Sequence, residues 1–341
     1  MKITRATLHP AQGGIVLWLF DERGRIGQGE ASPLAGYSPE TREQAFQALA
    51  AIQVEAFPPF DLARPVIPQV QDLLEALPPR VPSARFALET ALLDLVGQRM
   101  GLGLAWLLSQ GKPLASAPLS LLLPGDDSAV GKARLALQAG IQTVKLKVGR
   151  DLPREIALLE RLRREVDPRL RIRLDANQSL PPGEADLWLQ AFAAFCPELI
   201  EEPVPFALLR DLADSPIPLA LDESLQQPEV VFALAEILGR GLIRTLVLKP
   251  MALGGALSCL ALGEVARSRG VDSLVTHQMD GPIALAAAAA LALALGTESA
   301  CGLAPHAGLR AWPEIAMPFL GPDRIVLTDR PGLGLDELRL G

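Results

Sequence analysis

Residues 117–302 alternate short runs rich in aliphatic and β-branched residues with longer segments of helical periodicity. Strands that alternate with helices are typical of a parallel sheet, and eight such units predict a (β/α)8-type barrel. A doubly wound open sheet is the alternative, but no G-x-G-x-x-G or Walker A sequence follows any of these runs. The expected strands are 117–123, 143–148, 171–176, 198–202, 218–222, 245–249, 272–276 and 298–302.

The sequence before this region has a different pattern and predicts an α+β unit. Three strand-like runs separated by turn-rich sequence indicate an antiparallel meander, and three helical segments follow. We expect Ser83 to be the N-cap of the last helix and Gly101 to stop it. The Gly/Pro-rich loop 32–41 is either a lid over a site or a plain connection. The expected strands are 2–8, 14–20 and 25–31, and the expected helices are 41–56, 69–77 and 83–100.

The last part of the chain breaks the strand and helix rhythm with Pro-rich turns and one short strand at 324–327. We expect it to return and pack on the N-terminal unit. The predicted organisation is therefore an N-terminal α+β capping domain at 1–115, a barrel domain at 116–303 and a C-terminal segment at 304–341.

Charge and composition exclude several classes of partner. The 341 residues include 32 basic and 39 acidic side chains, a formal net charge of −7, and they form no basic stripe, so we expect neither nucleic acid nor membrane as a partner. The apolar run 283–295 is shorter than the ~20 residues of a spanning helix. The N-terminus lacks the apolar segment of a signal peptide, which predicts a cytoplasmic location. Three distant cysteines without CxxC spacing, Cys196, Cys259 and Cys301, predict neither disulfides nor a zinc site.

Two lysines mark the second predicted barrel strand. Lys145 and Lys147 point to the same face because side chains alternate along a strand. Two ammonium groups buried together without partners would be very costly, so this face holds either water or anions. The alternative is a purely structural role, in which the two lysines lie on a solvated edge strand. Only six lysines occur in the chain, and Lys249 ends another predicted strand.

The predicted strand ends carry a series of charged residues. Asp175, Glu201 and Asp222 lie about one strand and helix unit apart, so a barrel would gather them on one rim. Each of them alone could be a helix cap or a turn residue. Together, three converging carboxylates repel one another unless a cation lies among them, and hard oxygen ligands of this number suit Mg²⁺, which Mn²⁺ can replace.

The two outer lysines then fit acid and base chemistry. Lys147 and Lys249 arise from strands four apart in order, so they would face each other across a bound substrate. A divalent metal stabilises negative charge that develops when an α-proton leaves, and burial beside cations depresses the pKa of a lysine toward that of a general base. His277 and His306 are further candidate bases, but the lysines already fill that role.

At these positions the sequence resembles the enolase superfamily, in the branch with a lysine pair on the second barrel strand. The resemblance covers nearly the whole chain and implies a (β/α)7β barrel, with a capping domain built from the N-terminal part and the C-terminal tail. The segment at 29–41, GEASPLAGYSPET, resembles the lid of the dehydratase members. The matching barrel segments are KLKVG at 145–149, RIRLDAN at 171–177, LIEEP at 199–203, LDES at 221–224 and VLKP at 247–250.

The resemblance also implies roles. Asp175, Glu201 and Asp222 would bind Mg²⁺, Lys147 would be the base, and Lys249 would stabilise the developing charge from the other side. Anionic groups of a small-molecule dicarboxylate would be held by Lys145 and Arg173, and Tyr37 and Asn177 would also contact substrate. The implied activity is that of a carbon–oxygen lyase, a dehydratase; a racemase or epimerase and a muconate-type cycloisomerase are the alternatives on the same residues.

One segment departs from the family pattern. The seventh strand of familiar members ends in a Ser/Gly-rich segment with a glutamate, whereas residues 276–282 read THQMDGP here. The eighth predicted strand, 298–302, lacks the Asp-x-Asp that dipeptide epimerases use for the substrate amine. These departures concern the substrate more than the type of reaction. The sequence allows a homo-oligomer but does not specify one.

Overall fold

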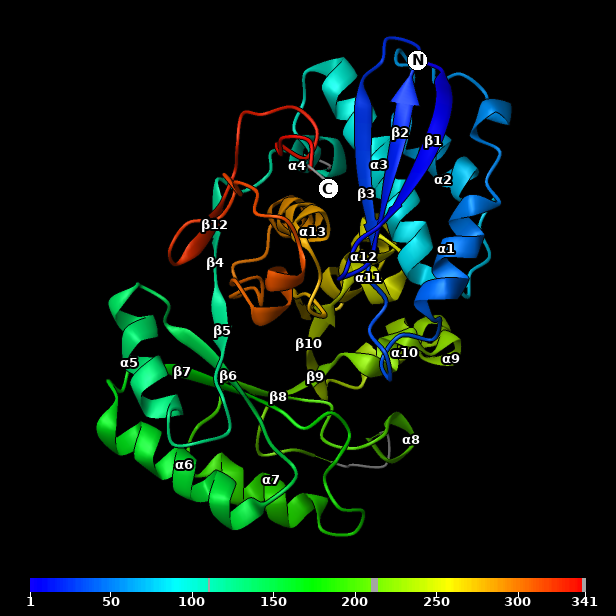
Figure 1. The fold of residues 1–341 in the computed structure, drawn as a ribbon. Coiled ribbons are helices and arrows are strands. Elements are labelled where there is room, and N and C mark those ends of the chain that lie inside the picture. Colours follow the sequence, from blue (N-terminus) through cyan, green and yellow to red (C-terminus); the bar gives the residue numbers. More distant parts are fainter. Residues whose placement is uncertain (110, 210–213, 339–341) are drawn as a thin grey trace.

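The computed structural model describes residues 1–109, 111–209 and 214–338, and an antiparallel sheet begins the chain (Figure 1). Its strands pair in sequence order, which confirms the predicted meander. Helices lie along one side of this sheet, and the long helix α3 packs directly on β3. The elements are β1 (Ile3–Pro10), β2 (Ile15–Asp21), β3 (Ile26–Ala31), α1 (Arg42–Ala50), η1 (Val54–Ala56), α2 (Val66–Leu74), α3 (Pro82–Met100) and α4 (Leu104–Leu108).

Two glycines allow the close packing of α3 on β3. A Cβ atom at Gly27 would lie 2.1 Å from the carbonyl oxygen of Ala91, and one at Gly29 would lie 1.9 Å from that of Ala87. Any larger residue would therefore force the helix away from the strand. The buried face of α3 runs over nearly its whole length, so this helix forms the core of the capping unit.

The ends of α3 agree only in part with prediction. Gly101 ends the helix in the left-handed conformation, with φ 70°, as expected. The prediction that Ser83 is the N-cap is wrong: the N-cap is Val81, and Pro82 is in the first turn, where its fixed φ is favourable. The backbone N–H of Ser83 instead donates to Glu40 Oε1 at 2.7 Å, so a distant carboxylate caps this helix.

A curved sheet of seven parallel strands forms the second layer (Figure 1). Two isolated parallel bridges, Thr276 to Gly302 and Leu119 to Cys301, join its two outer strands through the expected eighth strand. The ring is thereby closed, which confirms the barrel and excludes the open doubly wound sheet. Its strands are β5 (Ser120–Leu122), β6 (Thr143–Lys147), β7 (Arg171–Asp175), β8 (Leu199–Glu201), β9 (Leu219–Leu221), β10 (Ile243–Leu248) and β11 (Asp272–Val275).

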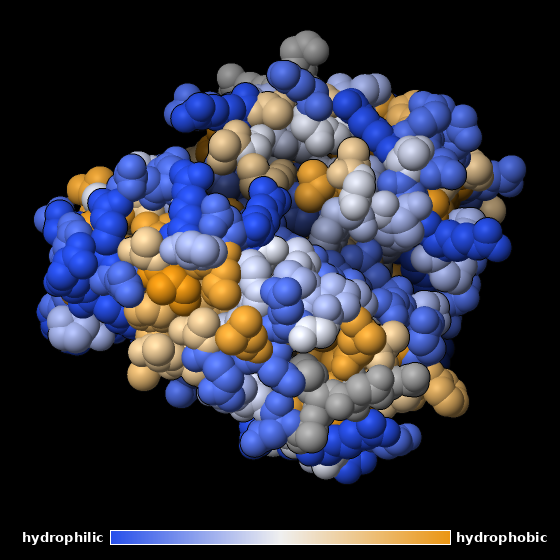
Figure 2. Space-filling model, turned by 90° about the horizontal axis from the view of Figure 1, so that it is seen from below, coloured by the Kyte–Doolittle hydropathy of each residue, from blue (hydrophilic) through white to orange (hydrophobic). Residues whose placement is uncertain are grey.

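Helices surround the barrel on its outer side (Figure 1). Seen from below, hydrophilic residues cover most of the molecular surface and hydrophobic patches lie between them (Figure 2). In the described part of the chain no helix is long and apolar enough to cross a membrane. The helices are α5 (Ala129–Gln138), α6 (Leu152–Glu165), α7 (Ala185–Ala193), α8 (Phe206–Leu209), η2 (Glu223–Gln226), α9 (Pro228–Phe232), α10 (Leu234–Gly239), α11 (Pro250–Leu253), α12 (Ala256–Ser268) and α13 (Pro282–Leu295).

The C-terminal part of the chain contacts both units. After η3 (Ala307–Ala311), strand β12 (Arg324–Val326) pairs antiparallel with β4 (Ser116–Pro118) at the start of the barrel. Further on, the N–H of Leu333 donates to Asp94 in α3 and the N–H of Leu338 to Gln28 in β3. The boundaries at 115/116 and 303/304 stay a prediction.

Two buried carboxylates of the capping unit hold two barrel helices. Glu30 accepts hydrogen bonds from the N–H groups of Gly281 and Ala284 at the start of α13, at 2.6 and 3.1 Å. Glu89 accepts from Ala256 and Leu257 at the start of α12, at 2.6 and 3.3 Å. Helix N-termini favour such acceptors. Burial nevertheless raises the pKa of Glu89 to about 8, with the two backbone donors lowering it in part.

We expect Glu89→Gln to change the pH dependence of stability. The pKa of Glu89 is higher in the folded chain than the usual value of 4.5, so between about pH 4.5 and 8 the folded state holds a proton that the unfolded state has lost. The free energy of unfolding of the wild type therefore falls as pH rises through this window, and Glu89 contributes a few kcal/mol to this fall. Glutamine keeps an acceptor and does not titrate. The melting temperature of the variant should rise relative to that of the wild type from pH 5 to pH 8. A difference between the two melting temperatures that does not change with pH would contradict this account.

Candidate active site

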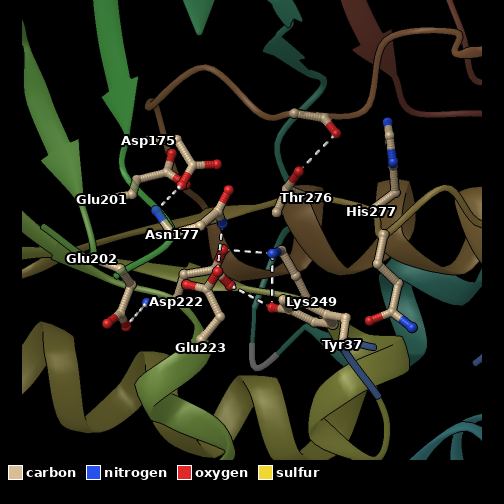
Figure 3. Close-up of polar contacts among 12 residues, drawn as sticks. Tyr37, Asp175, Asn177, Glu201, Glu202, Asp222, Glu223, Lys249, Thr276 and His277 are labelled. Carbon is tan, nitrogen blue, oxygen red and sulfur yellow. Dashed lines mark hydrogen bonds and ion pairs between the residues drawn. The ribbon is translucent and has the colours of Figure 1, made fainter. Parts of the chain in front are cut away.

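The strand ends bring the predicted site residues to one rim of the barrel. In the parallel register Lys147 lies beside Asp175, and Asp175 beside Glu201. Asp222 directly follows β9, and Lys249 directly follows β10. Figure 3 shows Asp175 and Glu201 close together, and Asp222 beside Lys249 and Tyr37. Because all strands run in the same direction, this rim is where loops and catalytic groups meet in such barrels.

Lys145 lies between two of the carboxylates. Its Nζ is 2.9 Å from Glu201 Oε2 and 3.0 Å from Asp175 Oδ2. Burial alone would lower the pKa of Lys145, but these two carboxylates outweigh it and hold the pKa above its usual range. Burial also acts to raise the pKa of Asp175, yet the ion pair with Lys145 keeps that pKa below the usual value. The two carboxylates therefore favour the ammonium form of Lys145 in this arrangement.

Lys249 and Tyr37 form a second cluster with Asp222. Lys249 Nζ is 2.5 Å from Asp222 Oδ2 and donates to the Tyr37 hydroxyl at 2.8 Å, and that hydroxyl donates to Asp222 Oδ1 at 3.0 Å. The ammonium also lies 4.3 Å from the centre of the tyrosine ring. Burial, followed by the charge of Asp222, raises the pKa of Tyr37 above its usual range, so the hydroxyl keeps its proton. The loop 32–41 thus supplies a side chain to the barrel rim.

Lys147 has a different environment from the other two lysines. Its side chain is exposed at the end of β6, and its Nζ donates to Asn177 Oδ1 at 2.6 Å. Asn177 Nδ2 in turn donates to Glu223 Oε1 at 2.5 Å. Burial and the neighbouring Asp222 raise the pKa of Glu223 to about 7. No ion pair with a carboxylate holds Lys147 in the described part of the chain.

Glu202 is a supporting residue for which the sequence analysis predicted no role of its own. Its Oε1 accepts from the N–H groups of Asp222 and Ser224 at 2.7 and 2.9 Å, and its Oε2 accepts from the Ser224 hydroxyl and from Gln178. It therefore fixes the backbone on which Asp222 stands. The only signal in the sequence is the doubled glutamate at 201–202, since one of two adjacent strand-end residues must point away from the rim.

Arg173 lies deeper than the rim. It shares the inner face of β7 with Asp175 but comes two residues earlier, about 6.6 Å further down the strand. Its side chain is 2% exposed; its Nε donates to Glu198 Oε2 and one of its Nη groups to the carbonyl of Ala300, both at 2.6 Å. In this position Arg173 links β7 to β8 and to the eighth strand segment.

The two histidines lie on the opposite wall, after β11. Their rings stack with centroids 3.9 Å apart, and His277 Nδ1 accepts from the N–H of Met279 at 3.0 Å. Burial lowers the pKa of His277 to about 3 and that of His306 to about 4, so both rings are neutral near pH 7. Next to them, Gln278 donates to Ser38 at 3.0 Å and so ties this segment to the 32–41 loop.

The chemistry of Asp175, Glu201 and Asp222 fits a hard divalent cation. As they stand, no three His, Cys, Asp or Glu side chains among the described residues surround one point closely enough to bind a metal, because these carboxylates turn to Lys145 and Lys249. The carboxylates are nevertheless close to one another: burial raises the pKa of Glu201 to about 7, and the charges of Asp175 and Asp222 contribute to the rise. The Lys145 ammonium marks one cation position between two of them. Carboxylate oxygens in this number suit Mg²⁺.

Fold and site together define a capped (β/α)7β barrel whose rim holds acidic side chains flanked by lysines. Residues 129–337 match the family model described as "Enolase C-terminal domain-like", which spans more than half of the chain. The chain belongs to this family and is an enzyme of the enolase superfamily, as the resemblance of its motifs predicted.

Related proteins carry several activities. The chain is 28% identical to the hydrophobic dipeptide epimerase of Enterococcus faecalis, over 98% of this chain and 94% of that protein. It is 27% identical to muconate cycloisomerase 1-1 of Acinetobacter lwoffii, over 98% and 89%, and 29% identical to o-succinylbenzoate synthase of Desulfotalea psychrophila, over 79% and 80%. The structure of a Methylococcus capsulatus dipeptide epimerase in complex with Mg aligns with a TM-score of 0.80 at 28% identity, covering 98% of this chain and 99% of that one.

We predict that the purified protein binds Mg²⁺ and that Asp222→Asn weakens this binding at least about tenfold, because the ligand set loses a negative charge. Isothermal calorimetry with MgCl₂ measures both. Asp186→Asn is the matched control, since Asp186 is exposed on α7, away from the barrel rim, and should leave the binding isotherm unchanged. Equal binding by the wild type and Asp222→Asn would remove Asp222 from the ligand set.

Proposed function

We propose that this enzyme is an o-succinylbenzoate synthase of menaquinone biosynthesis. The reaction is the Mg²⁺-dependent syn dehydration of 2-succinyl-6-hydroxy-2,4-cyclohexadiene-1-carboxylate to o-succinylbenzoate, with Mn²⁺ as a replacement metal, in the cytoplasm. Relatives named for this activity include proteins of Desulfotalea psychrophila and Klebsiella pneumoniae, the latter 27% identical over 90% of this chain. Epimerase and cycloisomerase relatives are equally similar, so the choice among activities rests on the site.

The unequal environment of the two outer lysines carries the proposal. Lys147 is exposed, and its hydrogen-bond partner among the described residues is the neutral amide of Asn177. Because no ion pair holds its charge, Lys147 can gain and lose a proton, as a general base must. Lys249 is 8% exposed and holds Asp222 and Tyr37. One proton carrier without an ion pair and one cation held by a carboxylate suit a reaction that uses a single base on one face of the substrate.

A syn dehydration needs these two groups. Neutral Lys147 takes the α-proton from the substrate and, now an ammonium, gives that proton to the departing hydroxyl on the same face, so that water leaves. Lys249 supplies positive charge on the other face, where the carboxylate gains electron density. Bound Mg²⁺ would supply Lewis-acid stabilisation of that negative charge. Lys145 is proposed to hold an anionic group of the substrate and Tyr37 to close over it. Arg173, which we predicted as a second anion ligand, is buried against Glu198 and Ala300, so we propose that it supports this wall from below.

A dipeptide or N-acylamino acid epimerase is the second candidate, since it would use Lys147 and Lys249 as two bases on opposite faces of the substrate. The similarity to the Enterococcus faecalis epimerase extends over 98% of this chain. A dipeptide also carries an ammonium group, which calls for a carboxylate partner. The eighth strand segment supplies none: Ala300 and Cys301 are buried, and Glu298 is exposed. This observation favours a substrate without an amine.

Substitution of the lysines by arginine distinguishes the two reactions. Arginine keeps a positive charge but does not act as a base near neutral pH. For the dehydratase, Lys147→Arg should lower kcat by about 10²-fold or more, whereas Lys249→Arg should keep a larger part of the activity because only its charge is needed. Steady-state kinetics measures both. Equal loss in the two variants would favour an epimerase, in which each lysine transfers a proton.

Proton NMR in D₂O with Mg²⁺ tests the substrate directly. One sample holds the cyclohexadiene substrate, and a second holds N-succinyl amino acids or dipeptides. Aromatic product in the first sample is the expected result, and Lys147→Ala should abolish it while the circular dichroism spectrum stays that of the wild type. Deuterium at the amino-acid α-position with racemisation, and no aromatic product, would replace the dehydratase by the epimerase.

A further inference from the structure

A chain of hydrogen bonds links Lys147 to the half-buried carboxylate of Glu223, with which it makes no hydrogen bond or ion pair of its own. Lys147 Nζ donates to Asn177 Oδ1 at 2.6 Å, and Asn177 Nδ2 donates to Glu223 Oε1 at 2.5 Å. The three residues come from three different strand ends: Lys147 is the last residue of β6, and Asn177 and Glu223 follow β7 and β9. Asn177 and Glu223 face each other beside Asp222 in Figure 3. Both ends of the asparagine amide are therefore occupied by protein groups.

Asn177 is held firmly in its place. Its φ is 42° and that of Gln178 is 62°, a left-handed pair that residues with side chains rarely adopt. The turn is secured on each side: the N–H of Asn177 donates to Asp175 Oδ1 at 3.2 Å, and the amide of Gln178 donates to Glu202 Oε2 at 2.9 Å. Backbone strain that surrounding bonds maintain is a frequent mark of functional sites.

Glu223 determines which end of the amide meets the lysine. An asparagine side chain can be turned over, since its oxygen and its NH₂ group have similar shapes. The carboxyl oxygen of Glu223 accepts, so the NH₂ group must face Glu223 and the carbonyl oxygen must face Lys147. With the opposite orientation two donors would meet at the lysine. Glu223 Oε2 is buried without a hydrogen-bond partner among the described residues, which costs free energy. The hydrogen bond that Glu223 Oε1 accepts from Asn177 offsets part of this cost.

We propose that Asn177 and Glu223 are positioning residues that fix the direction of the Lys147 amine, and that Asn177 acts through the lysine and not by binding substrate. This inference rests on the proposed function in one respect, the role of Lys147 as proton carrier. An exposed lysine has several rotatable bonds, whereas proton transfer needs its nitrogen within hydrogen-bond reach of the substrate carbon. A directional acceptor removes most of that freedom without adding a charge.

The scarcity of lysine makes a direct test practical. Protein labelled with ¹⁵Nζ-lysine has only six side-chain ammonium signals, from Lys2, Lys112, Lys132, Lys145, Lys147 and Lys249. We expect an ordered Lys147 ammonium in the wild type, loss of that order in Asn177→Ala and Glu223→Ala, and its retention in Glu223→Gln, whose amide oxygen can still accept. Lys145, held by Asp175 and Glu201, is the ordered reference, and exposed Lys132 is the mobile one. An equally ordered Lys147 in all four proteins would overturn the proposal.

Kinetics separates positioning from substrate binding. Asn177→Ala and Glu223→Ala should lower kcat by roughly 10- to 100-fold with KM changed by less than about twofold, and the primary deuterium isotope effect on kcat should increase because proton abstraction becomes slower. Glu223→Gln should recover most of the lost rate. A rise in KM with unchanged kcat would make Asn177 a substrate ligand, and equal losses in Glu223→Gln and Glu223→Ala would mean that the charge of Glu223 matters, not its acceptor; either result overturns the proposal.

The two hypotheses fail in different ways. If the wild type converts neither the cyclohexadiene nor the N-acylamino acids, the proposed function is wrong, while the NMR order of the Lys147 ammonium still decides the positioning role. If the wild type is active and Lys147 is as mobile as Lys132, the function stands and the positioning role is wrong.

Discussion

Repulsion among carboxylates at the barrel rim is the constraint on which the site depends. Asp175, Glu201 and Asp222 are brought together because parallel strands end on one side, and the fold gives them no means of separating. Lys145 and Lys249 neutralise them from below and from across the site, with contacts of 2.5 to 3.0 Å. Two of the three lysines at the rim, Lys145 and Lys249, are therefore engaged in ion pairs. The remaining one, Lys147, makes no ion pair among the described residues, which is why we propose it as the proton carrier.

The capping unit takes part in this arrangement and does not merely cover it. Glu30 and Glu89 of the capping unit accept hydrogen bonds from the first turns of the barrel helices α13 and α12. Hydrogen bonds to helix N-termini therefore join the two units in addition to apolar packing. From the loop that follows β3, Tyr37 reaches Lys249 and Asp222, which belong to different strands. A fixed cation on the barrel rim therefore depends on a side chain from the other unit.

Much of this could be predicted from the sequence, because period and position along a strand are local properties. The barrel, the meander and the residues at each strand end follow from alternation, turn residues and spacing. Contacts between distant parts could not be predicted in this way. The cap of α3 comes from Glu40, not from Ser83, and Arg173 lies beside Glu198 because depth in a barrel depends on the neighbouring strands. The pairing of each lysine with a particular carboxylate, and the support of Asp222 by Glu202, likewise depend on tertiary structure.

The eighth strand segment joins the ring through two isolated bridges, in contrast to the continuous ladders between the other strands. Cys301 and Gly302 carry the backbone hydrogen bonds of this seam, a shorter ladder than that between β6 and β7, so we expect local opening of the barrel to begin there. The seam adjoins Thr276 and His277, on the wall opposite Asp175 and Glu201. Amide hydrogen exchange would thus be faster at this seam than along β6 and β7, the two strands that end in Lys147 and Asp175.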